Sequence, residues 1–306
     1  MYDIWFPHLG ITIEHLRRVA FTIFDKDVYM YGVCMGTAIM MGVLLATVLA
    51  KKTKQDPELY IDFALYAVIF AVIGSRLYFV AFRWEDYSAD LLKIFALRSG
   101  GLAIYGGVIA GVLTAIVYAR VKKMNFWLLG DTAVPCLVLG QMLGRWGNFF
   151  NREAFGDYTD SLFAMRLQLS QVRTSDLSQE IIENIITVNG VDYVQVHPTF
   201  LYESVWCLAV LLILLYVTKH KKFHGQVSGI YFLGYALGRV WIEGLRTDQL
   251  LIGSIPVSQM LSAILIVGSL VLLMVLRRRP LVAEGVPIVT EKEEAEQEEK
   301  SDSEAK

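Results

Sequence analysis

Apolar residues along this chain gather into long runs that are separated by short polar stretches. A helix needs roughly 20 apolar residues to cross a bilayer core of about 30 Å, and runs near that length predict membrane spans. The runs are residues 28–50, 60–82, 101–119, 126–143, 200–218, 227–245 and 252–276. The pattern predicts an all-α polytopic membrane protein with seven transmembrane helices, of which the third, fourth and sixth are the least clearly apolar.

Lysine and arginine residues cluster after every second run, so one face of the predicted bundle is consistently basic. The clusters are Lys51, Lys52 and Lys54; Arg120, Lys122 and Lys123; Lys219, Lys221 and Lys222; and Arg277, Arg278 and Arg279. Basic residues are retained on the cytoplasmic side of a membrane. We therefore expect the N-terminus outside and the C-terminus in the cytoplasm.

The segments before, between and after the spans have different characters. Residues 1–27 are expected to form an N-terminal arm, in which 11–24 fits either an ordinary arm or an amphipathic helix along the membrane interface. The outer connection 144–197 of the seven-span domain 28–279 contains Asn189-Gly190 between two short β-prone runs. That pair is a strong hairpin signal, so we expect a small extracytoplasmic cap containing a β-hairpin. Residues 280–306 are acidic and are expected to be a disordered cytoplasmic tail.

Composition agrees with a membrane protein and excludes several other classes. Of the 306 residues, 55% are hydrophobic and 19% are charged, and the formal net charge is −2. A nucleic-acid-binding protein would carry a basic excess, so we expect no nucleic-acid partner. The three cysteines lie inside apolar runs, which excludes a disulfide framework, and no metal-ligand cluster or cofactor motif is present.

Charged side chains inside the runs are candidate functional residues, because each costs about 2.5–3.5 kcal/mol to insert. Tyr235, Arg239, Glu243 and Arg246 are spaced i, i+4, i+8 and i+11, which places them on one helix face. For Arg239 alone, an ion pair that merely joins helices is an alternative reading.

The stretch 144–156 follows the fourth run and combines glycines with polar side chains. Arg145 offers a planar fork that suits phosphate, and Asn148 and Asn151 offer amides for hydroxyl groups. His197 is expected to cap a helix or support the site rather than to react. The residues alone therefore predict a site for an anionic lipid headgroup, and they leave an enzyme and a lipid carrier both open.

The run GRWGNFFNREAFG at 144–156 resembles the signature of the prolipoprotein diacylglyceryl transferases, a bacterial membrane family. Three further blocks agree in the same order: GGLAIYGG around Tyr105, HPTFLYES at 197–204, and GYALGRVWIEGLRTD at 234–248. Similarity is also present at 29–32 and 74–76, and the resemblance covers roughly residues 20–276.

The resemblance implies that a diacylglyceryl group passes from phosphatidylglycerol to the lipobox cysteine of a preprolipoprotein signal peptide at the bacterial plasma membrane. It implies a thioether product, glycerol 1-phosphate as leaving group, and no cofactor or metal. The implied catalytic residues are Arg145, Arg239 and Tyr105. The implied substrate-binding residues are Tyr31, Arg76, Asn148, Asn151, Glu153, Gly156, His197, Tyr235, Glu243 and Arg246.

At the position of Tyr105, several members of the family carry a histidine, and that histidine has been proposed as the base for the thiol. A phenol with a pKa near 10 is a poor base for a thiol near 8.5. Either nearby arginines lower one of these pKa values, or no dedicated base is needed, since thiols are intrinsically strong nucleophiles. The role of Tyr105 stays unassigned, and an inactive or regulatory relative is a third alternative.

Overall fold

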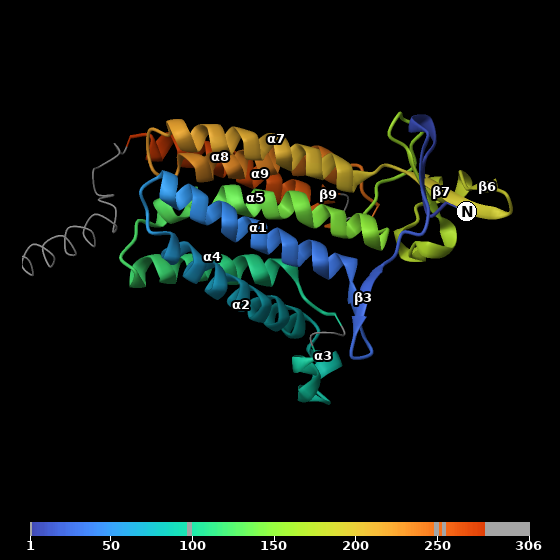
Figure 1. The fold of residues 1–306 in the computed structure, drawn as a ribbon, viewed down its shortest axis with the longest axis horizontal. Helices are drawn as coiled ribbons and strands as arrows, with labels where there is room; N and C mark the ends of the chain where they lie inside the picture. The colour runs from blue at the N-terminus through green and yellow to red at the C-terminus, as the bar shows by residue number, and fades with distance from the viewer. Residues whose placement is uncertain (1, 97–99, 248–250, 253–254, 279–306) are drawn as a thin grey trace, which may run out of the picture. The chain divides into compact units, whose positions relative to one another are not determined.

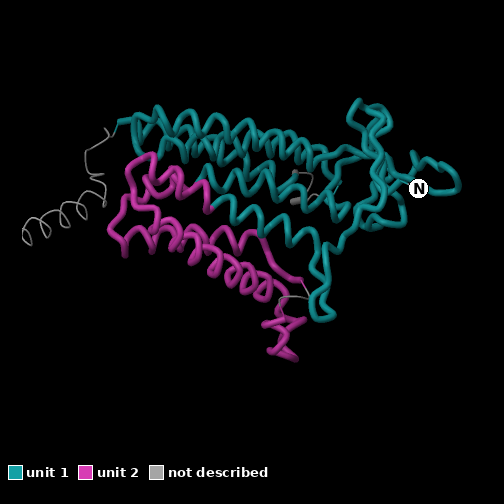
Figure 2. Tube along the Cα trace, in the orientation of Figure 1, with its two compact units in different colours: residues 1–42, 134–279 teal, residues 43–133, 280–306 magenta. Residues whose placement is uncertain are grey.

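The computed structural model describes residues 2–96, 100–247, 251–252 and 255–278 (Figure 1). These residues divide into two compact units (Figure 2). The first unit holds residues 2–42 and the described residues from 134 onward, and the second holds residues 43–133. The acidic tail expected at 280–306 lies outside the described residues.

Six helices among the described residues are long and apolar enough to cross a membrane. They are α1 (Met30–Lys52), α2 (Pro57–Phe82), α4 (Ile104–Val121), α5 (Phe126–Asn151), α7 (Thr199–His220) and α9 (Val257–Leu276). The run expected as the sixth span also forms a helix, α8 (Gln226–Glu243), which packs against α7 and α9. It is not one of the six, because Arg239 and Glu243 interrupt its apolar character.

A five-stranded antiparallel sheet forms in the first unit, in the order β2-β1-β5-β7-β6. Its strands are β1 (Ile4–Phe6), β2 (Ile11–Ile13), β5 (Met165–Gln168), β6 (Ile186–Val188) and β7 (Val191–Val196). Strands β6 and β7 join through Asn189-Gly190, both with positive φ, and Val188 pairs with Val191. Buried Ile4, Leu167 and Val194 belong to the hydrophobic core beneath this sheet.

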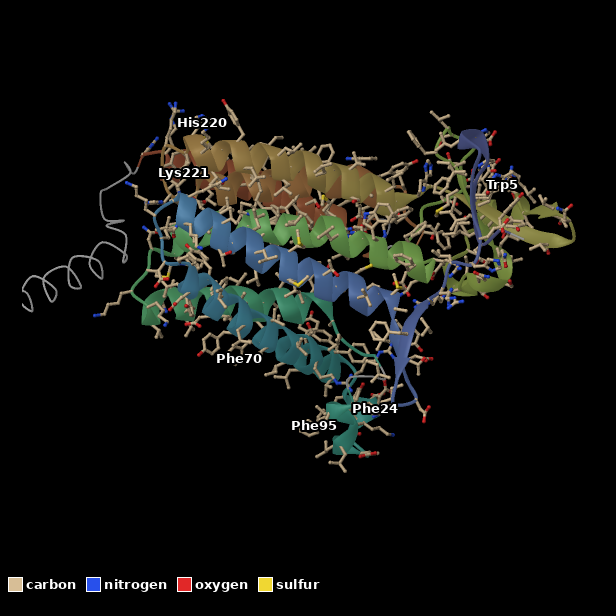
Figure 3. All side chains as sticks on the ribbon, viewed as in Figure 1. Trp5, Phe24, Phe70, Phe95, His220 and Lys221 are labelled. Carbon is tan, nitrogen blue, oxygen red and sulfur yellow. The ribbon has the colours of Figure 1, made fainter. Side chains whose placement is uncertain are left out.

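The amphipathic-helix reading of residues 11–24 is wrong, because the arm forms strands. Besides β2, it contains β3 (Val19–Ile23), which pairs with β4 (Lys26–Tyr29) directly before α1. Phe24 lies at the tip of this β3–β4 hairpin with 95% of its surface exposed (Figure 3). Short β-branched and aromatic runs such as VAFTI favour strands once a partner is available.

The remaining elements are short. They are the helices α3 (Trp84–Tyr87) and α6 (Gln179–Glu183), the strands β8 (Leu251–Ile252) and β9 (Ile255–Pro256), and the 3₁₀ turns η1 (Pro7–Leu9), η2 (Leu91–Phe95), η4 (Leu169–Gln171) and η5 (Thr174–Asp176).

In the second unit, α2 and α4 pack so closely that only glycines fit between them. A Cβ on Gly106 would lie 2.3 Å from the carbonyl oxygen of Gly74, and a Cβ on Gly107 would lie 2.5 Å from Ser75 Oγ. Gly111 has nothing within 4 Å of such an atom. Close packing against α2 therefore depends on Gly106 and Gly107, and not on Gly111.

The outer connection begins later than its expected boundary at residue 144. Helix α5 continues to Asn151, so most of the motif at 144–156 is helical and the connection starts at Arg152. The glycines at 144 and 147 are tolerated inside this helix because neighbours pack against them: Met35 lies beside Gly144, and the ring of Tyr31 covers Gly147. The motif thus presents its polar side chains from a rigid element.

Candidate functional site

Tyr235, Arg239 and Glu243 lie on α8 as predicted, whereas Arg246 lies beyond the end of the helix and not on its face. Arg239 Nη2 lies 2.5 Å from Glu243 Oε2, at the i, i+4 spacing of neighbours on a helix. Tyr235 lies one turn earlier, close enough to interact electrostatically with Arg239 and Arg145. Arg246 follows the helix, so the chain delivers two guanidiniums, a carboxylate and a phenol to one region of the first unit.

Glu203 of α7 brings arginines from three places in the chain together. Its Oε2 pairs with Arg145 Nη2. Its Oε1 lies 3.7 Å from Nη1 of Arg239 and 3.6 Å from Nη1 of Arg246. The Glu203 side chain is 7% exposed. We call these five residues (Arg145, Glu203, Arg239, Glu243 and Arg246) the arginine cluster.

Sequence reasoning missed Glu203 as a site residue, although it lies within the apolar run 200–218. The signal that could have identified it is the cost of burying a lone carboxylate, which requires cationic partners. The arginine cluster thus brings three guanidiniums and two carboxylates together. Guanidiniums held in this way are suited to binding phosphate.

A second polar group lies around Glu153, just after α5. Its Oε1 accepts hydrogen bonds from Asn148 Nδ2 at 3.3 Å and Asn151 Nδ2 at 3.1 Å. Its Oε2 accepts one from Arg173 at 3.1 Å. Tyr31 of α1 lies near both Glu153 and Arg145.

Backbone pairing fixes the position of Arg246 relative to the motif. Gly156 bridges to Arg246, and Asp157 N donates to Leu245 O at 2.8 Å. Gly156 also donates its N–H to His197 O at 2.9 Å. A Cβ at Gly156 would lie 2.7 Å from Leu245 O, so only glycine allows this close approach.

His197 contributes to this arrangement through its backbone and a ring contact. Its Nδ1 lies 3.3 Å from the hydroxyl of Tyr202. Burial lowers the pKa of the His197 imidazole, and the nearby Asp157 carboxylate opposes that shift. The supporting role expected for His197 stays a prediction.

This chain is similar to known proteins over most of its length. The model of the family described as prolipoprotein diacylglyceryl transferase matches residues 18–275. A relative from Bacillus cytotoxicus, named phosphatidylglycerol--prolipoprotein diacylglyceryl transferase, is 39% identical over 267 residues, which are 87% of this chain and 94% of the relative. Relatives of the same name from Bacillus mycoides and Bacillus cereus are 38% identical over the same shares.

The chain belongs to the prolipoprotein diacylglyceryl transferase family. With its six apolar helices and its bacterial relatives, it is a multi-pass protein of the bacterial plasma membrane. As a prolipoprotein diacylglyceryl transferase family member it carries the arginine cluster and the Glu153 group in the first unit.

Two residues expected at the transferase site belong to the second unit. Arg76 of α2 is 4% exposed. Its acceptors among the described residues are backbone carbonyls: Nε donates to Ile94 at 2.8 Å, Nη1 donates to Gly100 and Gly101, and Nη2 donates to Lys93 and Ala96. These hydrogen bonds connect α2 to the segment before α4. Tyr105 lies in the first turn of α4 and is 43% exposed.

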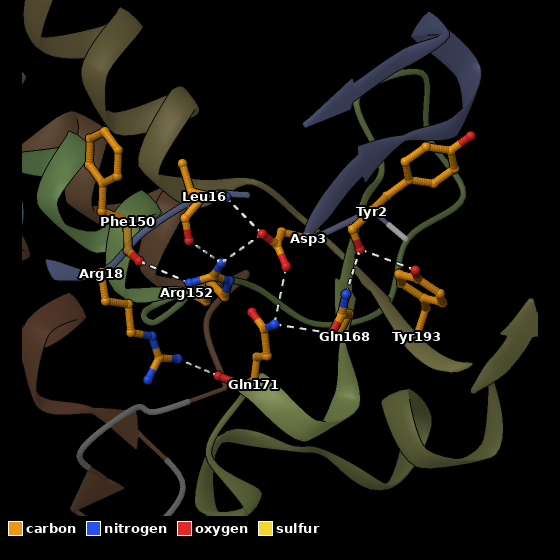
Figure 4. Close-up of polar contacts among 9 residues, drawn as sticks. All are labelled: Tyr2, Asp3, Leu16, Arg18, Phe150, Arg152, Gln168, Gln171 and Tyr193. Atoms are coloured by element: carbon orange, nitrogen blue, oxygen red, sulfur yellow. Dashed lines mark hydrogen bonds and ion pairs between the residues drawn. The ribbon is translucent and has the colours of Figure 1, made fainter. Parts of the chain in front are cut away.

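The end of α5 is tied to the N-terminal residues through Arg152, which has a φ of 55° (Figure 4). Its Nη2 donates to Leu16 O at 2.8 Å and lies 3.7 Å from Asp3 Oδ2. Burial lowers the pKa of the guanidinium, Asp3 opposes this shift and Arg18 adds to it. A cavity of about 330 Å³ beside it is lined by Asp3, Leu16, Arg18, Arg152, Ser170 and Gln171.

Among the described residues, no group of three or more His, Cys, Asp or Glu side chains is arranged to hold a metal ion.

Proposed function

We propose that this chain transfers the diacylglyceryl group of phosphatidylglycerol to the lipobox cysteine thiol of a prolipoprotein. The sulfur attacks the glyceryl carbon, an S–C bond forms, and the C–O bond to the phosphate breaks. Glycerol 1-phosphate leaves with the bonding electrons, and the thiol proton passes to solvent. The observation that carries the proposal is the arginine cluster, in which Glu203 contacts guanidiniums from α5, from α8 and from the segment after α8.

The arginine cluster supplies electrostatic stabilisation to this reaction. Negative charge grows on the phosphate as the C–O bond breaks, and guanidiniums already held in place stabilise it without reorganisation. Arg145 and Arg239 are the proposed catalytic residues because both are largely buried and converge on one carboxylate from different helices. Arg246, Glu243 and Tyr235 complete the phosphate site.

The polar group around Glu153 is proposed to bind the rest of the substrate. Asn148 and Asn151 lie on α5 one and two turns beyond Arg145, so their amides can meet the glycerol hydroxyls of a headgroup whose phosphate lies at the cluster. Tyr31 lies near both groups. Gly156 and His197 hold the backbone that positions Arg246.

The thiol needs no dedicated base in this mechanism. A cysteine thiol is a few per cent ionised near pH 7 and is a strong nucleophile as the thiolate. Tyr105 is therefore proposed as a substrate contact. The partners are phosphatidylglycerol, the preprolipoprotein signal peptide and the bilayer itself.

We also propose seven spans, with α8 as the seventh, the N-terminus outside and the sheet in an extracytoplasmic cap. Strand β7 leads directly into α7, which ends at His220 and Lys221, away from the sheet (Figures 1 and 3). Helix α9 likewise ends at Arg277 and Arg278. Basic residues at these ends support a cytoplasmic location for them.

The activity is tested with the purified chain in phosphatidylglycerol vesicles that contain a lipobox peptide. We expect the peptide to gain the mass of a diacylglyceryl group, and Arg145→Ala and Arg239→Ala to abolish that gain. Arg83→Ala is the matched control, since its side chain is 65% exposed in the second unit, and it should keep full activity. Full activity of both cluster variants would contradict the mechanism, and lipid binding without peptide modification would indicate a carrier.

A further inference from the structure

The Glu203 carboxylate is a negative charge placed where the proposed function calls for positive charge. Glu203 is 5% exposed and lies against all three arginines that are proposed to bind phosphate. We infer that Glu203 is a specificity-determining residue: its charge sets how tightly the arginine cluster holds the phosphomonoester product relative to the phosphodiester substrate. This inference rests on the proposed function.

The geometry indicates that Glu203 acts on two of the arginines through its charge. Oε2 is paired with Arg145, whereas Oε1 lies 3.6 to 3.7 Å from Arg246 and Arg239, which exceeds hydrogen-bond distance. Oε1 is buried and accepts no hydrogen bond from the described residues. A carboxylate oxygen without a donor, between two guanidiniums, interacts with them by Coulomb attraction over a short distance.

Glu203 is not needed to fix α7 in place, because its neighbours do that. Ser204 Oγ donates to Met142 O of α5 at 3.1 Å, and Thr199 Oγ1 donates to Ala154 O. These contacts attach the first turns of α7 to α5 and to the segment after it. The charge of Glu203 can therefore be removed while the helix keeps its register.

The substrate and the product of the reaction carry different charges, so the Glu203 carboxylate affects their binding differently. The phosphodiester of phosphatidylglycerol carries one negative charge, and the leaving phosphomonoester carries close to two near neutral pH, because its second pKa is about 6. Removing the Glu203 charge would make the arginine cluster more positive by one unit. This change stabilises the dianionic product more than the monoanionic substrate, and the product would then leave more slowly.

The test is inhibition by glycerol 1-phosphate in the wild type, Glu203→Gln and Glu203→Asp. We expect Glu203→Gln to bind this product about tenfold more tightly, because one buried negative charge has been removed. Slower product release should lower kcat, without a rise in KM for phosphatidylglycerol. Glu203→Asp keeps the charge, so its inhibition constant should stay close to that of the wild type. Uncharged glycerol should inhibit all three equally.

Equal inhibition constants for the wild type and Glu203→Gln would overturn the inference, and so would tight product binding by Glu203→Asp. If Glu203→Gln does not fold, Glu203→Ala, which also removes the charge, is measured in its place: relative to the monoanionic methyl ester, it should bind glycerol 1-phosphate more tightly than the wild type does. An unchanged ratio of the two inhibition constants would overturn the inference. These results leave the proposed function intact, whereas a wild type that never modifies the peptide would remove the proposed function itself.

Discussion

Tyr105 is the residue whose chemistry is least constrained by its surroundings. It lies in the first turn of α4, with 43% of its surface exposed. We expect Tyr105→Phe to retain peptide modification within about threefold, because a thiol needs no strong base near neutral pH. The same vesicle assay measures this. A loss of about a hundredfold or more would show that the hydroxyl takes part in acid–base catalysis.

His197 gives the cap a dependence on pH. Burial lowers its pKa in the folded chain, so the unfolded chain binds a proton first as the pH falls through about 6.5. Stability is therefore complete above that pH and declines below it. Thermal unfolding in detergent at pH 7.5 and 5.5 should show a smaller drop for His197→Gln than for the wild type. The exposed His220→Gln is the control, and an unchanged drop for His197→Gln would contradict this.

The sequence reveals single residues of the site better than it reveals their partners. Arg239 could be predicted because a charge in an apolar run is costly. Arg145 could be predicted because it lies in the stretch of glycines and polar side chains after the fourth run. The Arg239–Glu243 pair follows from helical spacing. The pairing of Arg145 with Glu203 could not be predicted, because it joins two helices whose relative rotation depends on packing along their whole length. The hydrogen bonds from the Arg76 guanidinium to backbone carbonyls could not be predicted for the same reason.

At the scale of elements, one short backbone pairing connects the motif on α5 to the residue after α8. We expect Gly156→Ala to destabilise the protein by about 1–3 kcal/mol, the usual cost of overpacking. Its Cβ would lie 2.7 Å from Leu245 O and 2.8 Å from His197 Cβ. Because the clash moves the Arg246 backbone, activity should fall more than stability alone explains.

Thermal unfolding and peptide modification measure the two effects of Gly156→Ala. Gly36→Ala is the matched control, since a Cβ there meets nothing within 4 Å, and it should change neither property. A fully stable and active Gly156→Ala protein would show that the pairing with Leu245 and Arg246 is not required.

For the molecule as a whole, the proposed orientation can be measured by labelling. In a cysteine-free background, Glu183→Cys on α6 and Lys222→Cys after α7 both provide exposed thiols. A membrane-impermeant maleimide should label Glu183→Cys in intact cells, and it should label Lys222→Cys only after the membrane is permeabilised. The opposite pattern would contradict an extracytoplasmic cap.

The helices of the fold were predictable and much of the sheet was not. Apolar runs mark α1, α2, α4, α5, α7 and α9 because the bilayer requires a minimum length of apolar helix. The β6–β7 turn is local and is marked by Asn189-Gly190. By contrast, β1 and β2 are only three residues each, and β1 pairs with β5 far along the chain, so no local pattern predicts them.

The pairing of Ile4 with Leu167 has a consequence for how the chain is made. Strand β1 is synthesised first, yet its partner follows some 160 residues later, a delay on the order of 10–30 s at ordinary rates of synthesis. During that time β1 is an unpaired edge, open to association with other chains. Biogenesis of this enzyme therefore depends on keeping its first residues unengaged until its second half has left the ribosome.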